Sequence, residues 1–135
     1  MTTSYVVNLI PFTRRPKASH KNGIFRMYTP TATLEEEALV AAAYKGEKHQ
    51  GAVKVTVHIY KALPASKPKR VERERNLTKP DIDNVLKAVL DGLNGVAYED
   101  DTQVVEVSVT KHDRVRRAGD SIRFSVEPIE DSRWL

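Results

Sequence analysis

Carboxylates gather in the middle of this chain, between Asp81 and Asp101. Asp81 and Asp83 flank a single residue, and side chains two positions apart in an extended segment point to the same side. Neighbouring carboxylates repel one another unless a positive charge lies between them, and Mg²⁺ prefers hard oxygen ligands. The spacing therefore predicts a Mg²⁺ site at Asp81 and Asp83, which Asp101 completes if the following strand lies beside them.

A helix is expected to carry part of this group, from about Asp81 to Asn94, where Asn94-Gly95 is a natural stop. Asp83, Lys87 and Asp91 are spaced four apart, so they share one helix face. The roughly opposite side carries an apolar stripe at helical spacing, formed by Val85, Leu86, Val89, Leu90 and Leu93. The acidic face is therefore expected to be open to solvent or substrate.

Basic residues lead into the acidic segment. The formal net charge is only +4, which is weak evidence for a polyanionic partner, but the charge is concentrated in 14–21, 61–79 and 111–117. The candidates for contacting phosphate groups are Arg14, Arg15, Lys17, Lys67, Lys69, Arg70, Arg73, Arg75 and Lys79. For any one of them alone, solubility is the better explanation.

Clustered carboxylates, a lysine and a basic approach together indicate a metal-dependent enzyme that acts on nucleic acid. Carboxylate-held Mg²⁺ activates water and stabilises the leaving oxygen of a phosphodiester, and Lys87 would add positive charge beside the transition state or offset carboxylate repulsion. Each feature also has a structural alternative. An aspartate caps a helix start, Asp100-Asp101 forms a turn, and Lys87 pairs with carboxylates one turn away.

The composition argues against several other chemistries. The chain has no cysteine, so it has no disulfide, thiolate nucleophile or cysteine-based zinc site. The four histidines show no zinc spacing, and no glycine-rich phosphate loop is present. No apolar run reaches membrane-spanning length, and the N-terminus lacks the pattern of a signal peptide. A cytoplasmic protein with no membrane partner is expected.

The rest of the chain predicts one domain over residues 1–135. Asn22-Gly23 is a strong signal for a tight hairpin turn. Thr33 is expected to cap a helix with Glu35–Glu37 in its first turn and a face of Leu34 and small residues, ending near Gly46. The expected strands are 5–10, 24–28, 53–60, 104–110 and 122–126, with a loop over 62–79 and the last two strands paired as a hairpin.

The central motif resembles that of the RusA family of Holliday-junction resolvases. The resemblance rests on three runs, Lys79–Lys87 (KPDIDNVLK), Leu90–Gly95 (LDGLNG) and Asp100–Val105 (DDTQVV). Together with the expected elements, it implies an α+β domain with a mixed β-sheet packed against two main helices. It also implies a homodimeric endonuclease of bacterial or phage origin that acts in DNA recombination and repair. Such enzymes use Mg²⁺ or Mn²⁺ to nick two opposed strands of a four-way junction symmetrically.

The family's catalytic residues fall on four positions of this chain, Asp81, Asp83, Asp101 and Lys87. Asp100 matches an acidic neighbour that supports the metal ligands, and Asn84 would orient a ligand carboxylate. Asp91 also matches, without an assigned catalytic role. Two alternatives stay open: a nuclease for other branched DNA, and a non-catalytic basic DNA-binding dimer that keeps the acidic residues for folding.

Overall fold

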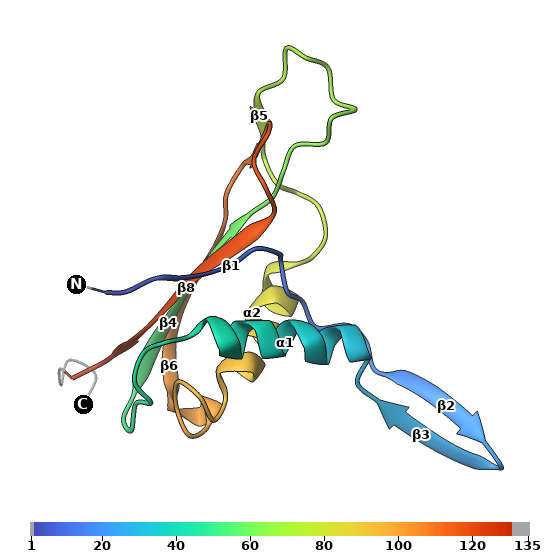
Figure 1. The fold of residues 1–135 in the computed structure, drawn as a ribbon, viewed down its shortest axis with the longest axis vertical. Helices are drawn as coiled ribbons and strands as arrows, with labels where there is room; N and C mark the ends of the chain where they lie inside the picture. The colour runs from blue at the N-terminus through green and yellow to red at the C-terminus, as the bar shows by residue number, and fades with distance from the viewer. Residues whose placement is uncertain (1, 131–135) are drawn as a thin grey trace.

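The computed structural model describes residues 2–130. In chain order its elements are β1 (Tyr5–Val7), β2 (Lys17–Lys21), β3 (Ile24–Tyr28), α1 (Thr31–Ala43), β4 (Val53–Tyr60), β5 (Arg73–Glu74), α2 (Ile82–Leu93), the short 3₁₀ helix η1 (Asp101–Gln103), β6 (Val104–Lys111), β7 (Arg114–Val115) and β8 (Ser121–Pro128). β1, β8, β4 and β6 form a mixed sheet in that order. Two arms extend from this centre (Figure 1). One is the β2–β3 hairpin, and the other is a loop lobe formed by residues 63–75 and 113–118, which contains β5 and β7. The predicted α+β class, with a mixed sheet and two helices, is confirmed.

The core lies between β4 and the two helices. β4 alternates β-branched or large apolar residues with polar ones, and its inward side chains Val53, Val55, Val57 and Ile59 are at most 1% exposed. They belong to one cluster with Val40 of α1 and with the buried stripe of α2. Apolar residues repeat every second position on β4 and about every 3.6 positions on α2, so each element has one apolar face, and these two faces pack together. The sequence predicted both repeats.

α2 lies in the crossover between two parallel strands. β4 and β6 run parallel, with Val53 opposite Val104, so the chain must travel back along the sheet before β6 begins. α2 makes this return. As a result, the start of α2 lies toward the end of β4, and η1 lies toward the start of β4. This connection decides where the acidic residues are placed.

Two expectations about local pairing have different outcomes. The Asn22-Gly23 turn is confirmed, because both residues have positive φ, 54° and 75°, as a two-residue hairpin turn requires. The predicted hairpin between the last two long strands is wrong. β6 and β8 both pair with β4, which lies between them.

The start of α1 also differs from the expectation. The helix begins at Thr31, after Pro30, and has no acidic residue in its first turn. Thr33 is buried, and its hydroxyl accepts a hydrogen bond from the Arg14 backbone N–H at 3.2 Å instead of capping the helix. Leu34 is exposed and Val40 faces the core, so the predicted small-residue face is not the packing face. Among the helices of residues 2–130, none has the length and apolar content to span a membrane.

Candidate active site

Asp81 occupies the N-cap position of α2. Its carbonyl accepts a hydrogen bond from the Val85 N–H at 3.2 Å, but its carboxylate makes no capping bond to the helix. The carboxylate Oδ2 instead lies 3.2 Å from Lys79 Nζ, and the Asp81 side chain is 50% exposed. Asp83 in the first turn is exposed as well. Both carboxylates predicted as metal ligands are therefore open to solvent.

Lys87 lies between carboxylates from two helices. Its Nζ is 3.6 Å from Asp91 Oδ2, one turn along α2. Burial raises the pKa of Glu37 on α1. The charge of Asp91 raises it further and the charge of Lys87 lowers it, so Glu37 lies near the Lys87–Asp91 pair. Glu37 was expected in the first turn of the helix, and no feature of the sequence placed it beside Lys87. Asp91 therefore lies beside Lys87 near the contact between α1 and α2.

Asp100 is an N-cap residue. Its Oδ2 accepts hydrogen bonds from the Thr102 hydroxyl at 2.6 Å and from the Thr102 N–H at 3.3 Å, and these contacts lower the pKa of Asp100. Gln103 completes a capping box, because its Oε1 accepts from the Asp100 N–H at 3.1 Å. Its Nε2 donates to the carbonyls of His49 and Gly51, both at 3.0 Å. This network fixes η1 and leaves the exposed Asp101 outside the capping bonds.

Tyr98 shows where Asp101 lies. The Tyr98 side chain is fully buried and its hydroxyl donates to the Leu90 carbonyl at 2.8 Å. Burial raises the pKa of Tyr98, and the charges of Asp101 and Asp91 raise it further. Asp101 therefore faces the C-terminal half of α2, whereas Asp81 caps the other end. Within residues 2–130, no three His, Asp or Glu side chains lie close enough to form a ready-made metal group.

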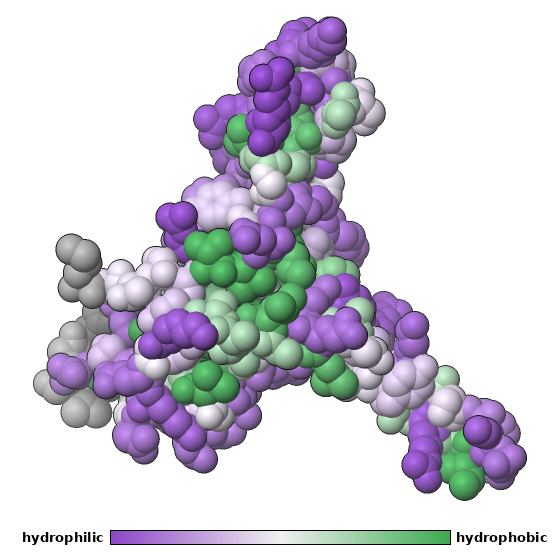
Figure 2. All heavy atoms as spheres, viewed as in Figure 1, coloured by the Kyte–Doolittle hydropathy of each residue, from purple (hydrophilic) through white to green (hydrophobic). Residues whose placement is uncertain are grey.

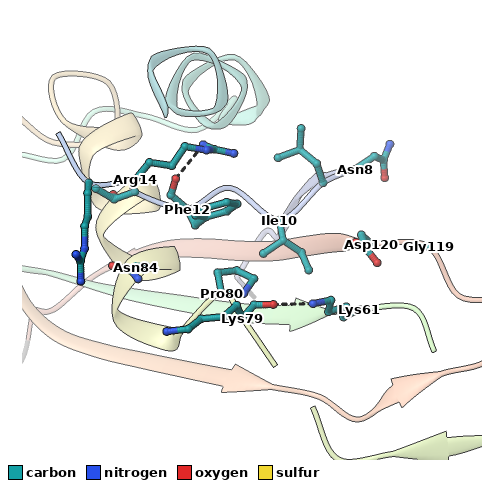
Figure 3. A pocket seen from close by; sticks show the side chains of 13 residues that line it. Asn8, Ile10, Phe12, Arg14, Lys61, Lys79, Pro80, Asn84, Gly119 and Asp120 are labelled. Atoms are coloured by element: carbon teal, nitrogen blue, oxygen red, sulfur yellow. Dashed lines mark hydrogen bonds between the residues drawn. The ribbon is translucent and has the colours of Figure 1, made fainter. Parts of the chain in front are cut away.

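A basic groove adjoins the start of α2. It encloses about 1060 Å³ between the N-terminal segment, the end of β4 and the Lys79-Pro80 dipeptide (Figure 3). Its lining carries four cations and one anion, which are Arg14, Arg15, Lys61, Lys79 and Asp120. Asn84 lines it from α2. Lys61 Nζ donates to the Lys79 carbonyl at 2.6 Å, which anchors the residue before the acidic motif. The groove therefore ends where the exposed carboxylates begin.

Several predicted phosphate contacts have partners within the protein. Arg14 donates to both carboxylate oxygens of Glu36, at 2.9 and 2.8 Å, and its guanidinium lies 3.9 Å from the centre of the Phe12 ring. This bidentate pair joins the N-terminal segment to α1. Arg14 therefore has a structural role that its position in a basic run did not reveal.

The loop lobe holds most of its basic residues in ion pairs. Lys67 Nζ is 3.3 Å from Glu74, and Arg73 and Arg75 lie 3.3 and 3.5 Å from Asp113. Two other predicted contacts, Lys69 and Arg70, are exposed, and no carboxylate of residues 2–130 pairs with either of them. Arg15 and Lys17 are exposed too. The structure thus separates the predicted basic residues into paired and unpaired groups.

Two lysines that contact the segment before Asp81 were not predicted from the sequence. They are Lys61, which also lines the basic groove, and Lys111. Lys111 Nζ donates to the Thr78 carbonyl at 2.7 Å, and Lys61 Nζ donates to the Thr78 hydroxyl at 3.0 Å. Each lysine lies at the end of a strand, so only the parallel pairing of β4 with β6 brings both to the segment before Asp81. The basic character of 61–79 and 111–117 was a partial signal.

Residues 10–123 match the protein family described as endodeoxyribonuclease RusA. The chain belongs to the RusA family. YqaN, an uncharacterized protein of Bacillus subtilis (strain 168), is 38% identical over 109 residues, which cover 72% of this chain and 77% of YqaN. The resemblance stated from the sequence is confirmed. The RusA match spans the hairpin, both helices, the two acidic segments and all of the groove lining except Asn8 and Leu9.

Proposed function

We propose that this RusA-family protein is a Mg²⁺-dependent, structure-specific endonuclease that resolves four-way DNA junctions by symmetric paired nicking. The observation that carries the proposal is the position of the acidic motif. Asp81 and Asp83 open to solvent at the start of α2, where a groove lined by Arg15, Lys61 and Lys79 ends. A polyanion lying along that groove would bring a phosphodiester to the carboxylates, and phosphate contacts fix register rather than sequence.

The donor chemistry of the acidic residues fits a divalent cation. Asp81 and Asp83 offer exposed carboxylate oxygens at the start of α2, which are the ligands that Mg²⁺ prefers, and we propose that these two residues hold the ion, with Mn²⁺ as a substitute. Asp101 is exposed as well, but in the same copy of the chain it lies toward the other end of α2 and does not reach this pair. When bound, the ion supplies activated water and neutralises charge on the phosphate. Lys79 occupies Asp81 without metal, and Lys87 balances the carboxylates around it. Asp100 keeps η1 in place and supports Asp101.

The substrate class follows from symmetry. A four-way junction has approximate two-fold symmetry, and a C₂ homodimer would present two equivalent acidic sites to two opposed strands. Two nicks made in this way release two separate duplexes, each with one nick that a ligase can seal, which is the step that recombination and repair require. The protein is proposed to act in the cytoplasm of a bacterial host, as a chromosomal, prophage or phage product.

The test is a panel of labelled synthetic DNAs: a four-way junction, a fork, a flap and a linear duplex of matched sequence. Each is incubated with the protein in Mg²⁺ and in EDTA, and products are mapped at single-nucleotide resolution. The proposal expects paired nicks in opposed strands of the junction, present with Mg²⁺ and absent with EDTA. Equal cutting of forks or flaps would assign a broader branched-DNA nuclease. Binding of the junction without cleavage in Mg²⁺ would assign a non-catalytic DNA-binding protein.

A further inference from the structure

The β2–β3 hairpin extends from the body of the protein with all ten strand residues exposed (Figures 1 and 2). Its strands carry large apolar side chains that the core does not use. Phe25 is 63% exposed and Met27 is 58% exposed. Contiguous exposed apolar residues of this kind mark a binding surface. None of the hydrogen bonds and ion pairs described above for the acidic site and the basic groove involves a residue of the hairpin.

The pairing register divides the hairpin into two faces of different chemistry. Residues directly opposite each other on an antiparallel ribbon share a face. His20 is opposite Phe25, and Ala18 is opposite Met27, so one face is aromatic and apolar. The other face carries the opposed pairs Lys17–Tyr28, Ser19–Arg26 and Lys21–Ile24. The ribbon therefore has a cationic side and a side suited to stacking.

Charge indicates which partner the hairpin fits. The first 34 residues contain no aspartate or glutamate, and their cations include Lys17, Lys21 and Arg26 on the hairpin itself. Within residues 2–130 no carboxylate pairs with any of these three side chains. A ribbon with unpaired cations and no anion complements a polyanion, and a two-stranded ribbon fits the grooves of duplex DNA.

The hairpin is continuous with the basic groove. Arg15, which lines that groove, is two residues before the start of β2. Five residues at strand rise reach about 17 Å, so the hairpin can extend along DNA well beyond the groove. A DNA that lies in the groove would therefore meet the hairpin next.

We propose that the β2–β3 hairpin is a DNA-contacting arm whose cationic face binds phosphates and whose other face stacks Phe25 on a base at the branch point. The inference rests on the proposed function, because a branch point supplies the unstacked base. Proteins insert apolar side chains between base steps and partly unstack them, and at a branch point the continuous stacking of a duplex is already interrupted. A base stacked on an aromatic side chain is held without regard to sequence.

The first experiment measures stacking without cleavage. A junction with 2-aminopurine beside the branch point is titrated with protein in EDTA, and fluorescence and affinity are recorded. Phe25→Leu is expected to lose the fluorescence change and to bind about tenfold more weakly, whereas Phe25→Tyr should keep both. Leu39→Ala, at an exposed apolar position on α1 (46% exposed, against 63% for Phe25), is the control. Because Phe25 is outside the core, circular dichroism should show unchanged folding for all three variants.

The second experiment measures the salt dependence of junction binding. Lys21→Ala with Arg26→Ala should reduce the slope of log affinity against log salt by about 2, one for each lost phosphate contact. Lys45→Ala with Arg123→Ala removes the same charge elsewhere and should leave the slope unchanged. Equal slopes for the two double variants would overturn the cationic part of the proposal.

The outcomes separate this inference from the proposed function. If Phe25→Leu binds and perturbs the junction as the wild type does, while wild-type protein cuts junctions in Mg²⁺, the arm proposal fails and the function stands. If the hairpin variants change only the oligomeric state, the hairpin is a contact between copies of the chain and the proposal is wrong. If they change only binding to anionic lipid vesicles, the partner is a membrane and the proposal is again wrong.

Discussion

Lys79 and Asp81 are joined by an ion pair, with 3.2 Å between Nζ and Oδ2, at the point where α2 begins. The lysine therefore occupies a carboxylate that we propose as a ligand of Mg²⁺. Removing the lysine charge should have opposite effects on the binding of Mg²⁺ and on the binding of DNA, because Lys79 also lines the basic groove.

Lys79→Met is expected to tighten Mg²⁺ binding by up to about fivefold, since an exposed ion pair is worth at most about 1 kcal/mol. The same change should weaken binding of junction DNA, because a groove cation is lost. Titration calorimetry with Mg²⁺ and a gel-shift assay in EDTA measure the two effects, and Lys45→Met is the control. Weaker Mg²⁺ binding by the variant would show that Lys79 does not compete with the ion.

At Gly92 the two helices approach each other closely. A Cβ at this position would lie 2.7 Å from the Glu37 carbonyl oxygen and 2.9 Å from Val40 Cβ. Gly92→Ala should therefore destabilise the protein by about 1–3 kcal/mol through overpacking, measured by urea unfolding. Gly51→Ala, where a Cβ meets nothing within 4 Å, should change stability by less than about 1 kcal/mol. Equal stabilities would mean that α1 and α2 pack differently.

His112 makes stability depend on pH. Its ring stacks on Tyr60 at 4.6 Å, and its Nε2 lies 2.8 Å from His58 Nδ1. Burial and the neighbouring His58 lower the pKa of His112 from its ordinary value of 6.5, so the folded state prefers the neutral ring. The unfolded chain binds a proton first as the pH falls. The contribution of His112 to stability is therefore full above about pH 6.5, falls as the pH drops from there toward the lowered pKa, and falls no further below it.

His112→Phe keeps a ring to stack on Tyr60 and removes this titration. Between about pH 7.5 and about pH 5.5 the wild type should lose more of its melting temperature than the variant loses. His20→Phe on the exposed hairpin controls for loss of a histidine as such. Parallel losses in wild type and His112→Phe would contradict the assignment.

Arg116 holds the loop lobe together. Its guanidinium donates to the carbonyls of Pro68 and Val71, each at 2.8 Å, and to that of Lys67 at 3.3 Å. Arg116→Ala should leave the core intact but speed trypsin cleavage after Lys69 and Arg70 by about tenfold, because one such bond is worth about 1.5 kcal/mol. Arg123→Ala is the control. An unchanged cleavage rate would show that the Arg116 guanidinium is not needed, and that the ion pairs and backbone hydrogen bonds of the lobe hold it.

Local features of the fold could be predicted from the sequence. The apolar stripe of α2, the alternation in β4 and the Asn22-Gly23 turn each depend on neighbours in the chain, and each is confirmed. The hairpin expected between β6 and β8 is wrong because strand order depends on long-range pairing. The parallel crossover through α2 separates these strands by the width of β4.

The candidate site shows the same division. The position of Asp81 at a helix start could be read from Lys79-Pro80-Asp81, and the motif predicted the RusA family. The positions of Glu37 beside Lys87, of Lys61 and Lys111 beside Thr78, and of Glu36 on Arg14 could not be predicted. These contacts join segments that only the assembled sheet and helices bring together.

The central claim is that Asp81 belongs to a metal-dependent nuclease site, and nicking of a labelled four-way junction in Mg²⁺ tests it most directly. Asp81→Asn should fold and bind the junction as the wild type does. Its nicking rate should fall by more than about a hundredfold, beyond the loss typical of residues that only support a ligand. Asp113→Asn, a carboxylate of the loop lobe, should keep the wild-type rate. Mg²⁺-dependent nicking by Asp81→Asn at the wild-type rate would contradict the account.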